Sequence, residues 1–334
     1  MIELTKGLIS LAPVLIFLAA LIFLDSYKLI TPWMIILTIL AGGMSALQSA
    51  LVNNLISSAG TLSPAAYSRY LAPLVEESAK AAFVLVLFRL NRIGFMVDAA
   101  IYGFAIGAGF SLVENAFYLY RLDTGNVLVW VIRGFGTAAM HASTMAMLAV
   151  TAKNLIDRQG HFRWWAFGPG LLLAYAIHSL FNHFILSPTL STVLLLIILP
   201  LLVLLVFQRS EKATQEWLGV GFDADQELIR QLSTGEFEET KIGVYLQSLR
   251  ERFPSTVVVD MFCLLRIHTE LALRAKGIMM MRQAGIEVPP DPELKEQLAE
   301  MKFLEKSIGQ TGKLAILPFV HTSSRELWQL TTIQ

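Results

Sequence analysis

Four long apolar stretches of the sequence carry side chains that can exchange protons or bind a metal ion. Five ionisable residues stand out there: Glu76, Glu77, Glu114, His141 and His178. An ionisable side chain inside a bilayer costs on the order of a few kcal/mol, so each requires a partner or a task. Hydrogen bonding between helices explains single polar residues, but three carboxylates repel one another. Metal binding or acid–base chemistry accounts for the set better.

The composition indicates that these stretches lie in a membrane. Apolar residues make up 55% of the 334 and charged residues only 16%, whereas a soluble domain has about a quarter charged. A helix needs about 20 apolar residues to cross the hydrocarbon core. We therefore expect an all-α membrane bundle of about seven transmembrane helices, at 8–24, 29–51, 66–88, 99–120, 127–151, 166–186 and 190–207.

Depth in the bilayer predicts one shared site. Counted from the inner helix ends, Glu76, Glu114, His141 and His178 fall within roughly 8 Å of depth near the middle of the membrane. His178 and Asn182 are four residues apart and share a helix face. Four helices thus contribute polar groups at one level, which favours a common polar site.

Small residues predict close packing around this site. Glu114 shares a helix face with Gly103, Gly107 and Ser111, and small residues at this spacing let a neighbouring helix approach closely. Glu76 and Lys80 are spaced for an ion pair along one helix. Pro73 must start or kink that helix just before the glutamates.

These motifs resemble the PrsW-type intramembrane proteases. The matching features are Glu-Glu-x-x-Lys at 76–80, Phe-x-x-x-Glu at 110–114, the mid-helix His141 and His-x-x-x-Asn at 178–182. The family belongs to a superfamily with the CAAX prenyl endoproteases and the bacteriocin-processing proteases. The resemblance covers residues 66–186. It implies hydrolysis of a peptide bond in membrane-anchored, single-pass proteins such as anti-sigma factors.

The resemblance leaves two mechanisms open. In both, a carboxylate of Glu76 or Glu77 is the base that activates water, and Asn182 or a histidine stabilises the oxyanion. In the metal version, Glu114, His141 and His178 bind Zn²⁺ and leave a fourth position for water. In the metal-free version, the histidines are hydrogen-bonding partners of a glutamate-activated water. We favour the metal version because three buried carboxylates require a cation.

A change of composition at Gln208 predicts two domains, a transmembrane protease domain at 1–207 and a cytoplasmic, mainly helical tail at 208–334. The first holds 11 Lys/Arg and 8 Asp/Glu, the second 15 and 18. The net charge of zero gives no reason to expect a nucleic-acid partner, and the single Cys263 excludes a disulfide framework within the chain. In the tail we expect helices at 224–252 and 254–284, a turn at 287–292 and a helix that begins at Pro292.

Loop charges predict the orientation in a bacterial inner membrane. With the N-terminus outside, eight Lys/Arg fall on the inner side and three on the outer side, which follows the positive-inside rule. The inner residues are Lys28, Arg89, Arg92, Lys153, Arg158, Arg163, Arg209 and Lys212, and the outer ones are Lys6, Arg69 and Arg121. The tail is then cytoplasmic.

Membrane proteins of other functional classes also carry Glu, His and Asn side chains in the middle of the bilayer. A proton- or cation-coupled transporter does so, although the sequence lacks the repeat symmetry that many transporters have. A catalytically inactive signalling scaffold is a further alternative.

Overall fold

The computed structural model describes residues 2–25, 30–58, 63–122, 124–159, 162–233, 237–284, 286 and 292–319. Within these ranges the regular elements are helices and no strand occurs, which confirms the all-α prediction. Contacts within the chain divide it into two units, Met1–Ser210 and Glu211–Gln334.

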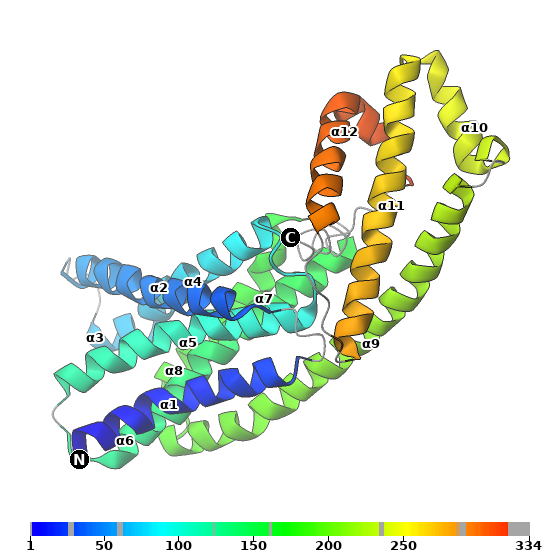
Figure 1. Ribbon diagram of the computed structural model, residues 1–334. Helices are drawn as coiled ribbons and strands as arrows, with labels where there is room; N and C mark the ends of the chain where they lie inside the picture. Colours follow the sequence, from blue (N-terminus) through cyan, green and yellow to red (C-terminus); the bar gives the residue numbers. More distant parts are fainter. Residues whose placement is uncertain are drawn as a thin grey trace. The chain divides into compact units, whose positions relative to one another are not determined.

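Helices of the first unit fall at each of the predicted membrane segments (Figure 1). In chain order they are α1 (Ile2–Phe23), α2 (Pro32–Ser58), α3 (Pro64–Ala66), η1 (Tyr67–Leu71), α4 (Ala72–Arg89), α5 (Met96–Arg121), α6 (Val127–Val131), η2 (Ile132–Thr137), α7 (Ala138–Gln159), η3 (Trp164–Phe167), α8 (Gly168–Asn182) and α9 (Pro188–Ser233), which continues into the second unit. The elements η1 and η2 are π-helices and η3 is a 3₁₀-helix.

Four of the helices in the described part of the chain, α1, α2, α5 and α9, are long and apolar enough to cross a membrane. The segments predicted at 66–88, 127–151 and 166–186 are assembled from shorter pieces, and two of them include a π-helix. They also carry the buried ionisable residues Glu77, Lys80, His141 and His178. The total of seven is therefore not confirmed by length and composition.

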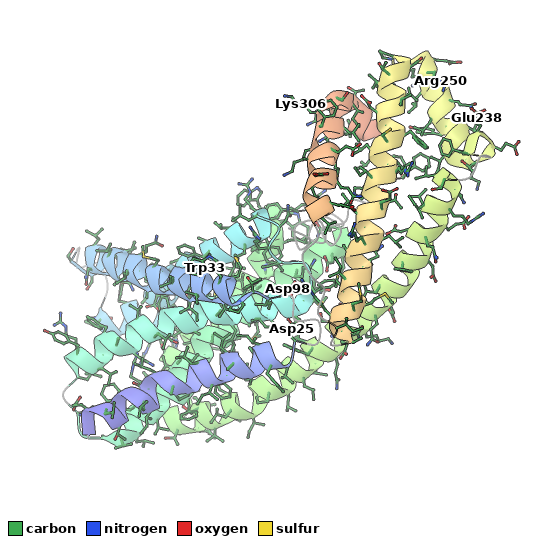
Figure 2. The ribbon with its side chains drawn as sticks, viewed as in Figure 1. Asp25, Trp33, Asp98, Glu238, Arg250 and Lys306 are labelled. Carbon is green, nitrogen blue, oxygen red and sulfur yellow. The ribbon has the colours of Figure 1, made fainter. Side chains whose placement is uncertain are left out.

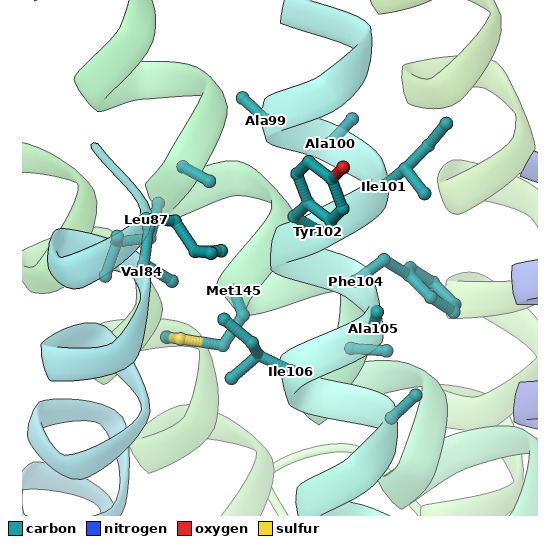
Figure 3. Packing of buried hydrophobic residues seen from close by; sticks show 14 of the residues in the cluster. Val84, Leu87, Ala99, Ala100, Ile101, Tyr102, Phe104, Ala105, Ile106 and Met145 are labelled. Carbon is teal, nitrogen blue, oxygen red and sulfur yellow. The ribbon is translucent and has the colours of Figure 1, made fainter. Parts of the chain in front are cut away.

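The helix α5 is the centre of the first unit. Its residues from Asp98 to Ser111 are all buried. Figure 3 shows Val84 and Leu87 of α4 on one side of α5, with Met145 of α7 close to Ile106. Because α5 is enclosed by its neighbours, polar groups on it reach the interior of the bundle instead of lipid.

Glycines allow the close approach of α5 to its neighbours that the sequence predicts. A Cβ atom added at Gly107 would lie 2.2 Å from the carbonyl oxygen of His141 in α7, and one at Gly103 would lie 2.5 Å from that of Met145. On the other side of α5, a Cβ at Gly109 would lie 2.0 Å from the carbonyl oxygen of Ile39 in α2. The small-residue prediction for Gly103 and Gly107 is thus confirmed.

The start of α5 is fixed by Asp98, whose buried carboxylate lies in the first turn (Figure 2). It accepts hydrogen bonds from the backbone N–H groups of Gly94 and Phe95, at 3.0 and 2.9 Å. A carboxylate in this position satisfies N–H groups that have no partner within the helix and interacts favourably with the helix dipole.

The second unit has a hydrophobic core of its own, which includes Met261, Leu265, Leu298 and Met301. Figure 2 labels Glu238, Arg250 and Lys306 among its polar side chains. Its remaining helices are η4 (Phe237–Glu239), α10 (Lys241–Ser248), η5 (Leu249–Glu251), α11 (Ser255–Gln283) and α12 (Pro292–Ile316).

Two of the predicted tail helices are confirmed by α11 and α12. The predicted single helix at 224–252 is wrong, because α9 continues to Ser233 and a separate helix, α10, begins after Thr240. The Thr240 side chain accepts a hydrogen bond from Gly243 N at 3.0 Å and so caps the new helix. Most of the predicted turn, residues 287–291, lies outside the described residues.

Candidate active site

Two adjacent glutamates of α4 have different surroundings. The helix follows directly from the π-helix η1, and Pro73 lies in its first turn; the missing proline N–H suits this change of winding. Glu77 is fully buried, whereas the Glu76 side chain is 14% exposed and lines a cavity. Glu76 alone of the pair therefore faces space that a substrate can enter.

Glu77 is enclosed by three polar partners. Its Oε1 accepts from Lys80 Nζ at 2.6 Å and from His178 Nδ1 at 2.7 Å, and its Oε2 accepts from Thr144 Oγ1 at 3.3 Å. The expected pair of Glu76 with Lys80 is thus wrong, since Lys80 binds Glu77 three residues away. Both Lys80 and Glu77 are inaccessible, and a buried charge needs its counter-charge in the same dry region.

The two histidines, His141 from α7 and His178 from α8, lie against each other. Their ring centroids are 4.7 Å apart and the rings are perpendicular. The Nδ1 atom of His178 donates to Glu77, and Nδ1 of His141 lies 2.9 Å from Lys80 Nζ. Since each Nδ1 has a partner in the protein, each ring has its Nε2 left for the cavity.

One potential ligand atom from each of Glu76, His141 and His178 lies within 4.8 Å of the others. This set has two imidazole nitrogens and one carboxylate oxygen, a combination common in metal-dependent hydrolases. A histidine that binds a metal usually donates its other ring N–H to a carboxylate or carbonyl, as His178 does to Glu77. The donor set therefore fits a divalent metal ion.

Glu114 of α5 also lies next to His141. Its Oε2 is 3.3 Å from His141 Nε2 and 3.1 Å from Nη2 of Arg133. The cluster that the structure brings together thus differs in one member from the predicted set, with Glu76 in the place of Glu114. Both carboxylates line the same cavity.

Asn182 is the last residue of α8 and also lines the cavity. Its Nδ2 donates to the carbonyl oxygen of Ser68 at 2.9 Å, next to η1. One of its amide N–H groups is therefore used to hold the segment in front of α4.

Asn53 and Tyr67 contact the site but were not expected there. The Tyr67 hydroxyl donates to Asn53 Oδ1 at 2.6 Å, and Asn53 Nδ2 lies 3.5 Å from Glu76 Oε1. Asn53 comes from α2, to which the sequence assigns no part of the site. The available signal was a pair of asparagines, Asn53 and Asn54, in an otherwise apolar helix.

The cavity has a volume of about 580 Å³. Both histidines line it, and other lining residues lie where α5 ends and where α6 and α9 begin: Leu122, Val129, Phe184 and Pro188. Figure 1 shows the end of α5 and the start of α6 together at one end of the first unit. The site is thus lined both by buried polar residues and by residues from one end of the bundle.

A family model described as PrsW family intramembrane metalloprotease matches residues 31–206, just over half of the chain. The chain belongs to this family. The match confirms the resemblance found in the motifs, and it contains every site residue named above. Neither the curated proteins nor the solved structures contain a match to the chain.

Membership of the PrsW family supports an intramembrane protease and favours it over the transporter and scaffold alternatives. The family is described as metal-dependent, and the group formed by Glu76, His141 and His178 is a candidate for the metal site. Peptide hydrolysis also requires a base and donors for the oxyanion. Cavity-facing carboxylates and N–H groups of the chain offer both.

Proposed function

We propose that the chain is a zinc-dependent intramembrane endopeptidase that hydrolyses a peptide bond with a glutamate-activated water. The main support is the convergence of Glu76, His141 and His178 on one buried cavity. We assign these three as ligands, because two histidines and one glutamate with an open fourth position are typical of catalytic zinc. Bound there, zinc would supply Lewis acidity for the water and for the substrate carbonyl.

Glu114 is the remaining carboxylate of the cavity, and we assign it the proton transfers. It takes a proton from the attacking water and delivers it to the leaving amine. Glu76 and Glu114 thereby exchange the roles that the sequence predicts for them. Glu77 holds His178 and Lys80 in place and is no base, since its oxygens are enclosed away from the cavity.

One contact supports the metal-free alternative. A protonated Lys80 can only donate, so Nδ1 of His141 accepts and the ring proton lies on Nε2, which faces Glu114. In that arrangement His141 is a hydrogen-bond donor and a glutamate alone activates water. A metal ion at Nε2 would replace this proton.

For the membrane we propose seven crossings, with α3, η1 and α4 as one, α6, η2 and α7 as another, and η3 with α8 as a third. The loop charges favour the N-terminus outside a bacterial inner membrane and the tail in the cytoplasm. The end of the bundle where α5 ends and α9 begins then faces outward. Cleavage accordingly takes place near the outer side of the membrane.

We propose single-pass membrane proteins as the substrates, including regulatory proteins of the anti-sigma type. The proposal rests on the resemblance and on a cavity whose lining joins apolar residues such as Leu122 and Phe181 to polar ones. Such a lining suits a segment that leaves the bilayer at its outer surface.

The function is tested with purified full-length protein in liposomes that also hold one single-pass anti-sigma protein at a time. We expect one defined cut, its loss after dialysis against a chelator, and its return with zinc. A panel of such substrates that all stay intact would refute the proposed protease. Undiminished cleavage by protein free of metal would establish the metal-free mechanism instead.

A further inference from the structure

Arg133 lies on the wall of the cavity and has an unused donor. It belongs to the π-helix η2, and its side chain is 13% exposed. Its Nη2 is buried and has no hydrogen-bond partner among the residues that the structure describes, although Glu114 Oε2 is 3.1 Å away. A buried donor without a partner costs about 1–3 kcal/mol, so a role for this group is expected.

The guanidinium is held firmly from behind. Its Nε donates to Asn115 Oδ1 at 2.9 Å, and it stacks 3.7 Å from the centre of the Tyr118 ring. Asn115 in turn donates to the carbonyl oxygen of Ser10 in α1 at 2.8 Å. The helices also meet closely here, since a Cβ atom at Gly134 would lie 2.1 Å from the carbonyl oxygen of Ile9. Arg133 is therefore preorganised.

Neighbouring donors are less suited to bind a substrate. Lys80 is completely buried and is engaged by Glu77 and His141. Asn182 donates one of its two amide N–H groups to Ser68, so its amide is held by the segment before α4. Arg133 differs from both, because its Nε is fixed while its Nη2 lies in an ion pair with Glu114 but makes no hydrogen bond, so it can donate to an acceptor beside the reacting groups.

We propose that Arg133 is a catalytic residue that donates from Nη2 to the scissile carbonyl oxygen as this becomes an oxyanion. The inference rests on the proposed function. Donors aimed at a developing negative charge commonly lower the barrier of acyl transfer.

The reaction itself defines when this donor is needed. The water oxygen bonds to the carbonyl carbon, the water proton passes to Glu114, and the carbonyl π electrons move to the oxygen. The negative charge that develops on this oxygen is the charge that Nη2 of Arg133 stabilises. Return of the electron pair then breaks the C–N bond, and the proton passes to the leaving nitrogen. The attraction to Arg133 is thus strongest in the transition state, which is the requirement for catalysis.

The experiment compares Arg133→Gln and Arg133→Lys with the control Arg121→Gln, in the full-length protein. Arg121 ends α5 and is exposed, stacking on Phe117. The probe is a fluorogenic peptide that carries one transmembrane segment and the bond that the wild type cleaves. We expect Arg133→Gln to lower kcat about 100-fold or more with KM within about twofold, and Arg133→Lys to recover part of the rate. The control retains both constants.

Two further measurements separate catalysis from a structural role. Metal content and unfolding temperature should equal those of the wild type, and a phosphinic analogue of the cleaved bond should bind Arg133→Gln about 100-fold more weakly. A kcat within tenfold of the wild type, an effect on KM alone, or a loss of metal would overturn the proposal. If Arg133→Gln does not fold, the rate and analogue affinity of Arg133→Lys decide, and wild-type values for both would overturn it. A wild type that cleaves nothing refutes the proposed function instead.

Discussion

The Nδ1–H group of His178 donates to Oε1 of Glu77 at 2.7 Å, and the same oxygen accepts from Lys80. The contact connects a cavity-facing imidazole to a carboxylate that has no exposed surface. Glu77 thus fixes the orientation of the ring and balances the charge of Lys80. Of the two adjacent glutamates, Glu76 therefore lines the cavity, and Glu77 lies behind it and holds the residues that do.

Replacement of Glu77 by Gln should destabilise the fold. It leaves the charge of Lys80 buried without its partner, and breaking a buried pair in this way costs about 3–5 kcal/mol. We expect a loss of this size in the free energy of unfolding, measured by titration with SDS in mixed micelles. The activity should fall as well, because His178 loses its acceptor.

The controls for this prediction are Glu76→Gln and the double variant Glu77→Gln/Lys80→Met. Glu76 is partly exposed to the cavity, so its neutral variant should unfold like the wild type when both are compared free of metal, since bound zinc itself adds stability. The double variant removes both charges and should recover most of the lost stability. Glu77→Gln protein as stable as the wild type would show that the Lys80 pair contributes nothing.

The packing of α5 on α7 gives a prediction at Gly107. The new Cβ of Gly107→Ala would lie 2.2 Å from the carbonyl oxygen of His141 and 2.5 Å from Cα of Ala142. Backbone must move to relieve this contact, at a cost of about 1–3 kcal/mol, and His141 moves with it. We expect lower stability and at least a tenfold loss of cleavage rate. Gly7→Ala is the control, since nothing lies within 4 Å of its added Cβ; equal behaviour of both variants would contradict the packing argument.

That the ionisable residues share one site could be predicted from the sequence, for a physical reason. Ionisable groups are so costly in lipid that Glu76, Glu114, His141 and His178 could only be explained together, and the structure does bring them to one cavity. The close packing of α5 at its glycines could also be predicted, because Gly103 and Gly107 lie four residues apart on one helix face.

Which side chain of a helix faces the cavity could not be predicted from the sequence. Adjacent residues point about 100° apart on a helix, so the choice between Glu76 and Glu77 requires the phase of α4. The π-helix η1 changes that phase just before the glutamates. Asn53 was missed for another reason, since a neutral amide in an apolar helix is ordinarily a packing contact.

Orientation is tested with reporter fusions after Arg209 and within 122–126. The loop charges predict that these two points lie on opposite sides of the membrane, with the fusion after Arg209 in the cytoplasm. We expect alkaline phosphatase activity at 122–126 only, and fluorescence of a cytoplasm-dependent reporter after Arg209 only. The same side for both points, or the reverse assignment, would contradict the outward-facing cavity.

The roles of Glu76 and Glu114 are separated by their metal content. Glu76 groups with the two histidines, whereas Glu114 contacts Arg133 and only one of them. We therefore expect Glu76→Gln protein to lose most of its zinc, as does His178→Ala. Glu114→Gln protein should keep close to one zinc per chain and cleave at least about 100-fold more slowly, because it lacks the group that carries the proton.

The measurement is elemental analysis of the purified variants, each followed by the cleavage assay. Thr192→Ser is a suitable control, since Thr192 is buried, donates from its hydroxyl to Pro188 O and belongs neither to the metal cluster nor to the cavity lining. Zinc lost from Glu114→Gln and kept in Glu76→Gln would restore the ligand set expected from the sequence and make Glu76 the base. Zinc lost from both would make both carboxylates ligands, and the water would then need another base. Active wild-type protein without zinc would remove the metal altogether and leave the Lys80-bound His141 as a hydrogen-bond donor to Glu114.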